Sequence, residues 1–217
     1  MKERFLGMDT CTRRLNLALV DQEGEVLGEV GEDVTTHATR LVPAIDSLLK
    51  KVDAGPADVT AIGVTVGPGS FTGIRIGIAT ALGMARAGNI PVYPIDSLTA
   101  LAKRCKVEGR GAVLLDARRS QVYLCTFLRR GAELQPAGEA VAMDTSKVLQ
   151  GDPGYRWVVG DGIQLVEGWP ASCRLITPVP NAGLSAAKEA MEAFSEGRPG
   201  VLPKPVYVRR PDARPPV

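Results

Sequence analysis

The sequence of 217 residues contains a single histidine, His37, and this scarcity excludes several kinds of enzyme. A metal site with two histidines cannot be built from one such chain. A Ser-His-Asp triad would depend on His37 alone, and no G-x-S-x-G motif lies near it to supply a nucleophile. We therefore expect no catalytic residue and no metal ligand, and we expect His37 to be a partly exposed residue near the start of a helix.

Aromatic residues, paired cysteines and long apolar runs are also scarce. Aromatics make up 5% of the chain, so the core must consist mainly of Val, Ile, Leu and Ala. The four cysteines form no C-x-x-C pair, which argues against zinc and redox motifs. The longest apolar helical run, residues 76–85, is too short to cross a bilayer, and the N-terminus has no signal-peptide core. With a net charge of +2, nothing requires a nucleic acid or a membrane as partner, and we expect a soluble, cytoplasmic protein.

Apolar patterns and turn residues divide the chain into two similar halves. Residues 4–9 are predicted as a buried strand ending in Asp9, and a polar turn leads to a second strand at 15–20. Residues 111–116 and 121–127 repeat this pattern, with Asp116 in the place of Asp9. Two such halves predict an α/β protein with a duplicated ribonuclease-H-like fold, the two-lobed fold of actin, Hsp70 and sugar kinases. We expect an N-terminal lobe at 1–108, a smaller C-terminal lobe at 109–209 and a disordered tail at 210–217.

A glycine-rich segment, Gly-Pro-Gly-Ser-Phe-Thr-Gly-Ile-Arg at 67–75, follows a predicted buried strand at 61–66. It opens a helix that we expect from about Thr72 to Gly88. A strand, a glycine-rich turn and a helix start with free N–H groups can receive an anion. The same glycines can instead let backbones pack closely. The sequence leaves both interpretations open.

The two turns that contain Asp9 and Asp116 bear on whether the chain holds ATP between its lobes. Neither turn, 9–14 or 116–120, contains glycine, so close approach of a phosphate is disfavoured. The two carboxylates could bind Mg²⁺ through water, or they could stabilise turns at strand ends. We expect no independent ATPase activity. A vestigial nucleotide cleft would involve Asp9, Thr10, Gly67, Gly69, Ser70 and Asp116.

Small residues recur at every fourth position of the second predicted helix, at Gly73, Gly77, Ala81 and Ala85. Each interior glycine costs a helix about 1 kcal/mol relative to alanine, so something must offset it. Close approach of another element along this row is the simplest explanation. That element is either a helix of a partner protein or the chain's own sheet, and the sequence favours neither.

Pairs of arginines stand in equivalent turns of the two halves. Such pairs are ordinarily solvated surface, but in this architecture both turns face the cleft, where they could attract a polyanion such as tRNA. No aromatic residues are interleaved with them, as single-strand binding would require. The predicted rim consists of Arg13, Arg14, Arg118 and Arg119.

These features make the chain similar to the bacterial TsaB (YeaZ) family, whose members help to install threonylcarbamoyl on adenosine next to the anticodon of certain tRNAs. The resemblance rests chiefly on residues 67–75 and the small residues that follow. It extends over most of the chain, whereas residues 129–180 add little. The supporting positions are Asp9, Thr10, His37, Leu41, Pro43, Ile45, 116–118, Val122, Tyr123, Pro205, Tyr207 and Arg209.

The resemblance implies a non-catalytic subunit that pairs with the catalytic protein TsaD, is joined by the ATPase TsaE, and reaches tRNA through the complex. TsaD holds a metal through an H-x-x-x-H pair on its first helix, and the matching positions here are His37 and Leu41, so that site is absent. The chain alone is expected to bind no cofactor, with ATP and metal on the partner subunits, and to form a homodimer. The expected partner interface is His37, Leu41, Ile45, Leu48, Gly73, Ile74, Gly77, Ala81 and Ala85.

Two alternatives from other functional classes remain. One is a glycoprotease-like peptidase, which the lone histidine opposes. The other is a sugar-kinase-like ATPase, which the glycine-free turns oppose.

Overall fold

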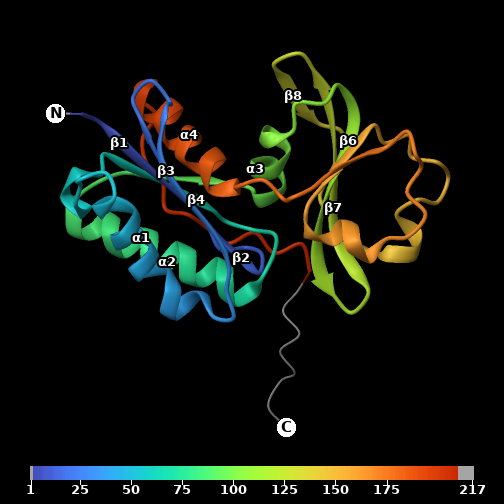
Figure 1. The fold of residues 1–217 in the computed structure, drawn as a ribbon, viewed down its shortest axis with the longest axis horizontal. Coiled ribbons are helices and arrows are strands. Elements are labelled where there is room, and N and C mark those ends of the chain that lie inside the picture. The colour runs from blue at the N-terminus through green and yellow to red at the C-terminus, as the bar shows by residue number, and fades with distance from the viewer. Residues whose placement is uncertain (1, 210–217) are drawn as a thin grey trace, which may run out of the picture.

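A computed structural model describes residues 2–209, and within this range the chain forms two lobes, each built on one sheet (Figure 1). The first sheet has five strands in the order β3-β2-β1-β4-β5. The second has six in the order β11-β10-β6-β7-β8 with β9 also paired to β7. The predicted α/β fold with two lobes is confirmed. The strands are β1 Arg4–Asp9, β2 Arg14–Asp21, β3 Val26–Asp33, β4 Ala61–Thr65, β5 Val92–Ile95, β6 Gly109–Arg118, β7 Gln121–Arg130, β8 Glu133–Pro136, β9 Val141–Asp144, β10 Trp157–Val159 and β11 Arg174–Ile176.

The predicted repeat is present in the topology of the two sheets. In the first lobe, β1 pairs antiparallel with β2 and parallel with β4. In the second, β6 pairs antiparallel with β7 and parallel with β10. Each lobe therefore presents a strand–turn–strand hairpin whose turn follows an aspartate, Asp9 or Asp116.

Helices cover both faces of the first sheet. The four α-helices of the described range are α1 His37–Lys50, α2 Phe71–Gly88, α3 Ser97–Arg104 and α4 Ala182–Ser195. In Figure 1, α1 and α2 lie below this sheet and α4 lies above it. Strand side chains alternate between the two faces of a sheet. Leu6 and Met8 of β1 therefore pack between the sheet and helices α1 and α2, whereas Phe5 packs between the sheet and α4.

Helix α4 approaches the sheet over two glycines that pair in register, Gly7 and Gly63. A Cβ on Gly7 would collide with the carbonyl of Gly183, and one on Gly63 with the carbonyl of Ala186. The helix side of this contact consists of small residues as well, since Ala186, Ala187 and Ala190 are fully buried. The absence of side chains on the strands is therefore what lets the helix backbone lie against the sheet.

This packing changes the content of the predicted lobes. The range 109–209 includes α4, yet α4 packs on β1, β2, β4 and β5 of the first sheet. In the sequence, α4 follows the strands of the second sheet, but it packs on the first lobe. It does so because the first sheet carries the glycines that let the helix backbone approach. The predicted tail, 210–217, lies outside the described residues.

Most of the predicted elements are observed, and the second lobe contains the omissions. Asp96 caps α3, its carboxylate accepting a hydrogen bond from the N–H of Thr99 at 2.9 Å. The strands β8 and β9 and the short 3-10 helices Thr145–Lys147 (η2) and Asp161–Leu165 (η3) were not predicted; a third, η1, spans Pro56–Asp58. None of the described helices has the length and apolar character needed to cross a membrane.

Residues 196–209, here called the strap, connect the end of α4 to the second lobe and form no helix or strand. The N–H of Val201 donates to the carbonyl of Val92 at 3.0 Å, and that of Val206 to the carbonyl of Val66 at 2.7 Å. The ring of Tyr207 lies 5.0 Å from that of Phe71. Arg209 then donates to Oε1 of Gln121 at 3.0 Å, so the strap contacts both lobes.

Candidate functional site: the cleft between the lobes and the outer helices

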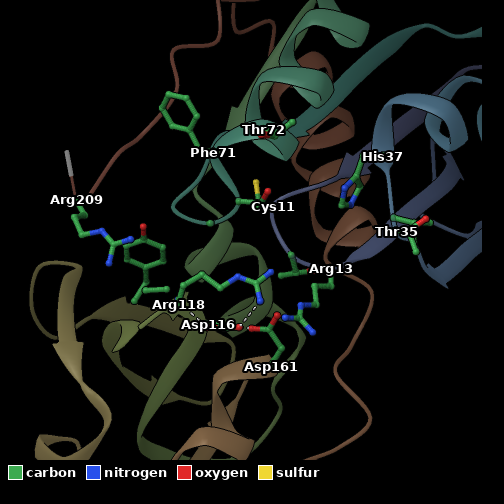
Figure 2. Close-up of a pocket in the computed structure, with 16 residues that line it drawn as sticks. Cys11, Arg13, Thr35, His37, Phe71, Thr72, Asp116, Arg118, Asp161 and Arg209 are labelled. Atoms are coloured by element: carbon green, nitrogen blue, oxygen red, sulfur yellow. Dashed lines mark hydrogen bonds and ion pairs between the residues drawn. The ribbon is translucent and has the colours of Figure 1, made fainter. Parts of the chain in front are cut away.

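A cleft of about 310 Å³ lies between the two lobes (Figure 2). The first lobe lines it with the β1–β2 turn and with the starts of α1 and α2, and the second with the end of β6 and the start of η3. Of the six residues predicted for a nucleotide cleft, Gly69, Ser70 and Asp116 line it. Asp9, Thr10 and Gly67 do not, for reasons that their contacts explain.

Asp9 lies behind the cleft wall and stabilises the turn after β1. Its carboxylate accepts hydrogen bonds from the hydroxyl of Thr65 at 2.7 Å, the amide of Asn16 at 3.0 Å and the N–H of Cys11 at 3.1 Å. Asp9 is 1% exposed and does not line the cleft, and its carboxylate is already occupied by these three donors. Of the two interpretations of this residue, the structure favours turn stabilisation. Thr10 is also buried, and its hydroxyl donates to the carbonyl of Gly73 at 2.7 Å.

The glycines of the segment at 67–70 allow close contacts within the chain. Gly67 has a φ of +105°, and a Cβ on it would meet the carbonyl of Val206 in the strap. A Cβ on Gly69 would meet the carbonyl of Cys11, which also accepts the N–H of Ser70 at 2.6 Å. The backbone here is therefore held against the β1–β2 turn and the strap. Ser70 caps α2, since its hydroxyl oxygen accepts the N–H of Gly73 at 3.2 Å.

Two carboxylates stand on the second-lobe wall. Asp116 is ion-paired with Arg118 at 3.3 Å, and its N–H donates to Oδ1 of Asp161 at 2.9 Å. Burial raises the pKa of Asp161, and the nearby charges of Asp116 and Asp9 add to that effect. Asp161 is a cleft residue that the sequence analysis missed. Its position directly after the buried strand β10 was the available signal.

His37 occupies the first turn of α1 and lines the cleft. It is 9% exposed, so the expectation of a partly exposed histidine was wrong; the β1–β2 turn and the start of α2 line the cleft beside it. Its Nε2 has no hydrogen-bond partner among the described residues. Burial lowers the pKa of His37, with the Arg14 main chain and the Asp9 charge opposing that shift. Leu41, one turn further, is fully buried in the core, and the described residues contain no cluster of three metal-ligating side chains.

The row of small residues on α2 faces the chain's own sheet. A Cβ on Gly73 would collide with the carbonyl of Thr10, and one on Gly77 would contact the side chains of Thr10 and Val64. The expectation that this row meets a partner helix is thus corrected, because the end of β1 and β4 already fill the space beside it. The other apolar residues assigned to the partner interface belong to the same core, buried for Leu41, Ile45, Leu48, Ile74 and Ala81 and partly buried for Ala85.

The exposed sides of α1 and α2 carry a different set of residues. Val42 of α1 is 60% exposed. On α2 a second row at i, i+4 spacing, Ala79, Gly83 and Ala87, is exposed. A Cβ on Gly83 would meet nothing within 4 Å. The sequence contains this second row at the same spacing, but it is shorter than the row that begins at Gly73.

The four predicted rim arginines are only partly brought together. Arg13 and Arg118 line the cleft from opposite lobes, whereas Arg14 and Arg119 do not line it. Arg14 instead donates to the carbonyl of Gly31 at 2.7 Å. Arg209, from the strap, joins the cleft lining. Figure 2 shows Arg13 close to Asp161 in this view, with Arg118 beside Asp116.

Two lobes of the same hairpin-and-parallel-strand plan around a cleft define the class of proteins that includes actin, Hsp70 and the sugar kinases. Comparison with known proteins narrows this class. A family model described as TsaD, tRNA N6-adenosine threonylcarbamoyltransferase, matches residues 30–212. The solved structure of YeaZ from Pseudomonas aeruginosa superposes with a TM-score of 0.76 at 27% identity, over 94% of this chain and 99% of that one. The chain belongs to the TsaB (YeaZ) family.

Sequence relatives agree with this assignment. The tRNA threonylcarbamoyladenosine biosynthesis protein TsaB of Escherichia coli is 27% identical over 95% of this chain and 94% of its own length. An uncharacterized protein of Mycobacterium tuberculosis is 34% identical over 97% of this chain and 93% of its own length. The chain spans only 56% of a longer relative in Mycobacterium leprae, to which it is also 34% identical.

Proposed function

We propose that this chain is a non-catalytic subunit of the machinery that makes N6-threonylcarbamoyladenosine in tRNA, and that it acts by pairing with TsaD in the cytoplasm. Family membership and the names of the relatives from Escherichia coli and Bacillus subtilis support the pathway. The burial of Leu41, at the position where the resemblance puts a metal ligand in TsaD, supports the non-catalytic role. ATP and metal would then be held by TsaD and the ATPase TsaE, and tRNA would be reached through the assembled complex.

The outer face of α1 and α2 is the observation that carries the pairing proposal. Here Val42 is an exposed apolar residue, Pro43 beside it is exposed, and Ala79 and Gly83 leave the surface of α2 almost flat. Rows of small residues at i, i+4 spacing let two helices approach closely. A partner's helices would therefore fit against this outer face, while the inward row, Gly73 and Gly77, holds α2 on its own sheet. The same face would mediate a homodimer when TsaD is absent.

The two glycines of α2 provide a matched test. Gly83→Leu places a bulky side chain on the outer face, so the variant should melt near the wild-type temperature but fail to copurify with TsaD and fail to support tRNA modification. Gly77→Leu forces the same side chain against Thr10 and Val64, so the melting temperature itself should fall. A Gly83→Leu variant that still binds TsaD would remove the outer face from the interface.

We further propose that the arginines of the cleft contribute to tRNA binding by the complex. Arg13 and Arg118 line the cleft from opposite lobes, whereas Arg14 donates to the carbonyl of Gly31. Reversing Arg13 and Arg118 to Glu should lower tRNA modification by the assembled complex without affecting TsaD pairing. Reversing Arg14 and Arg119 together to Glu is the charge-matched control, since neither lines the cleft, and it should have the smaller effect. Unchanged turnover in the double variant would assign these arginines to ordinary solvated surface.

A further inference from the structure

We propose that the cleft binds a small oxyanion, one group of the phosphate, sulfate or carboxylate kind, between His37 and the starts of α1 and α2. The proposal does not depend on pairing with TsaD, because it concerns the isolated chain. It also differs from a nucleotide site, since Asp9 is enclosed and the glycine-rich turn is packed against its own chain.

Helices α1 and α2 both begin at the wall of the cleft. Thr35 and His37 at the start of α1, and Ser70, Phe71 and Thr72 at the start of α2, all line it. Neither helix has an acidic residue in its first turn, and the N-cap of α1, Thr36, makes no capping side-chain bond. The partial positive charges of the two N-termini are therefore not neutralised by their own helices. Their sum favours a negative group in the space between them.

Donors remain available at the start of α2. The N–H of Ser70 is taken by Cys11 and that of Gly73 by the Ser70 hydroxyl. The N–H groups of Phe71 and Thr72 lie in the first turn of α2, where the helix has no carbonyl that could accept from them. No other described residue accepts from them either. They are therefore free to donate to an oxyanion in the cleft.

His37 supplies the independent observation that points to a ligand. It is buried to nine-tenths, and its Nε2 is a polar atom with no partner among the described residues. Figure 2 draws His37 on the first-lobe wall, with Thr72 above it and Arg13 below it in this view. A buried polar atom without a hydrogen-bond partner destabilises the folded chain. An oxyanion in the cleft would give that atom a partner and favour its protonated form.

The charged groups around the cleft are arranged so that one oxyanion can be held near the N-termini of α1 and α2. They do not attract a cation to that part of the cleft. On the first-lobe side they are Arg13, in the turn before β2, and the enclosed Asp9. The second lobe contributes Asp116, already paired with Arg118, and Asp161, while Arg209 comes from the strap and Tyr123 from β7. Both cleft-lining carboxylates thus lie on the wall opposite the helix N-termini. Asp161 and His37 both have displaced pKa values, so a bulk pH profile would mix the two groups.

The lone histidine makes a direct measurement possible. His37 is the only imidazole in the sequence, so its Cε1–H resonance in an NMR spectrum reports one titration. We expect the midpoint to lie below the ordinary histidine value in chloride and to rise by about one pH unit in sulfate at equal ionic strength. A shift of that size means tenfold tighter sulfate binding to the protonated form. The same midpoint in both salts would overturn the proposal.

Neighbouring arginines separate a local site from general screening. Arg13→Gln and Arg14→Gln remove the same charge, but only Arg13 lines the cleft. The sulfate-induced shift of the His37 midpoint should shrink in Arg13→Gln and persist in Arg14→Gln. Equal loss in both variants would show that sulfate acts through the overall charge and would refute a site.

A second readout uses stability and covers the case in which the resonance is broadened. Sulfate should raise the melting temperature of the wild-type chain more at about pH 6 than at about pH 8, because the protonated form binds the anion more tightly. His37→Gln, which cannot gain a proton, should show the same sulfate effect at both pH values. A wild-type effect that does not depend on pH would contradict the role given to His37.

Discussion

The negative charge of Asp161 lowers the stability of the folded chain. Burial raises its pKa, and Asp116 and Asp9 add negative charge nearby. A carboxyl with a raised folded-state pKa contributes stability below its unfolded pKa, and this contribution is lost as the pH rises through the folded value. The penalty from Asp161 is therefore largest at neutral pH.

We predict that Asp161→Asn raises the melting temperature at neutral pH, because the amide oxygen can still accept the N–H of Asp116 without carrying a charge. The advantage should disappear when the pH falls below about 4, where the wild-type carboxyl is protonated in both states. Thermal melts across this pH range test the prediction. Asp116→Asn is the control, because it removes the ion pair with Arg118 together with one of the charges that act on Asp161, and any gain in stability should be smaller than that of Asp161→Asn. An Asp161→Asn variant less stable than wild type at neutral pH would indicate that the charge is needed.

The cysteines carry a second prediction at this scale. Burial raises the pKa of Cys11 to about 12 and those of Cys105 and Cys125 to about 11. Because the thiolate is the reactive form, all three should react slowly with iodoacetamide at about pH 8 in the native chain. Unfolding in denaturant should make all four cysteines reactive, and mass spectrometry would count them. Rapid labelling of Cys11 in the native state would mean that the cleft wall opens.

At the level of elements, the contact of α4 with the first sheet gives a paired prediction. Gly63→Ala places a Cβ against the carbonyl of Ala186, and a helix backbone cannot move cheaply. We expect a loss of about 1–3 kcal/mol, seen as a lower melting temperature. Gly83→Ala adds the same methyl group to an open helix surface and should gain up to about 1 kcal/mol. Equal melting temperatures for the two variants would contradict the close approach of α4.

The sequence predicted the elements of the first lobe well, because Asp9, Asp96 and the apolar runs mark strand ends, caps and cores by local rules. It could not assign the Gly73–Gly77 row, since a small-residue row fits a partner helix and the chain's own sheet equally well. Only the position of Thr10 beside both glycines decides the matter. The short strands β8 and β9 escaped because they have little apolar pattern of their own and form only by pairing with β7.

The sequence predicted where the cleft lies but not all of the residues that line it. The two hairpin turns mark it, and Asp116, Arg13 and Arg118 were found that way. Asp161 and the burial of His37 depend on how the lobes and helix starts meet, which no local pattern records. The same holds for Asp9, whose three hydrogen-bond donors come from its own turn, β2 and the end of β4.

At the scale of the whole molecule, the strap contacts both lobes. Tyr207 packs on Phe71, and its hydroxyl oxygen accepts a hydrogen bond from Nε of Arg75 at 3.2 Å. We predict that Tyr207→Ala lowers stability by about 1–2 kcal/mol, which corresponds to a fall of roughly 2–8 °C for a chain of this size. The freed strap should also let the lobes move, which small-angle X-ray scattering would detect as a larger radius of gyration.

Leu202 provides the control for that variant, because it lies on the same strap but is 68% exposed. Leu202→Ala should leave both the melting temperature and the scattering profile unchanged. If Tyr207→Ala also left both measurements unchanged, the strap would not determine the orientation of the lobes, which would then depend on other contacts.

The return of α4 to the first sheet has a consequence for the order of events on the ribosome. Phe5, Val20, Ala61 and Tyr93 are synthesised early, yet the helix that covers them begins only at Ala182. Throughout translation of the second lobe, the first sheet therefore has one apolar face bare, and its folding waits on contacts of long sequence separation. A nascent chain stalled before α4 should bind chaperones and expose its first lobe to protease. Release of the last residues should end both conditions together.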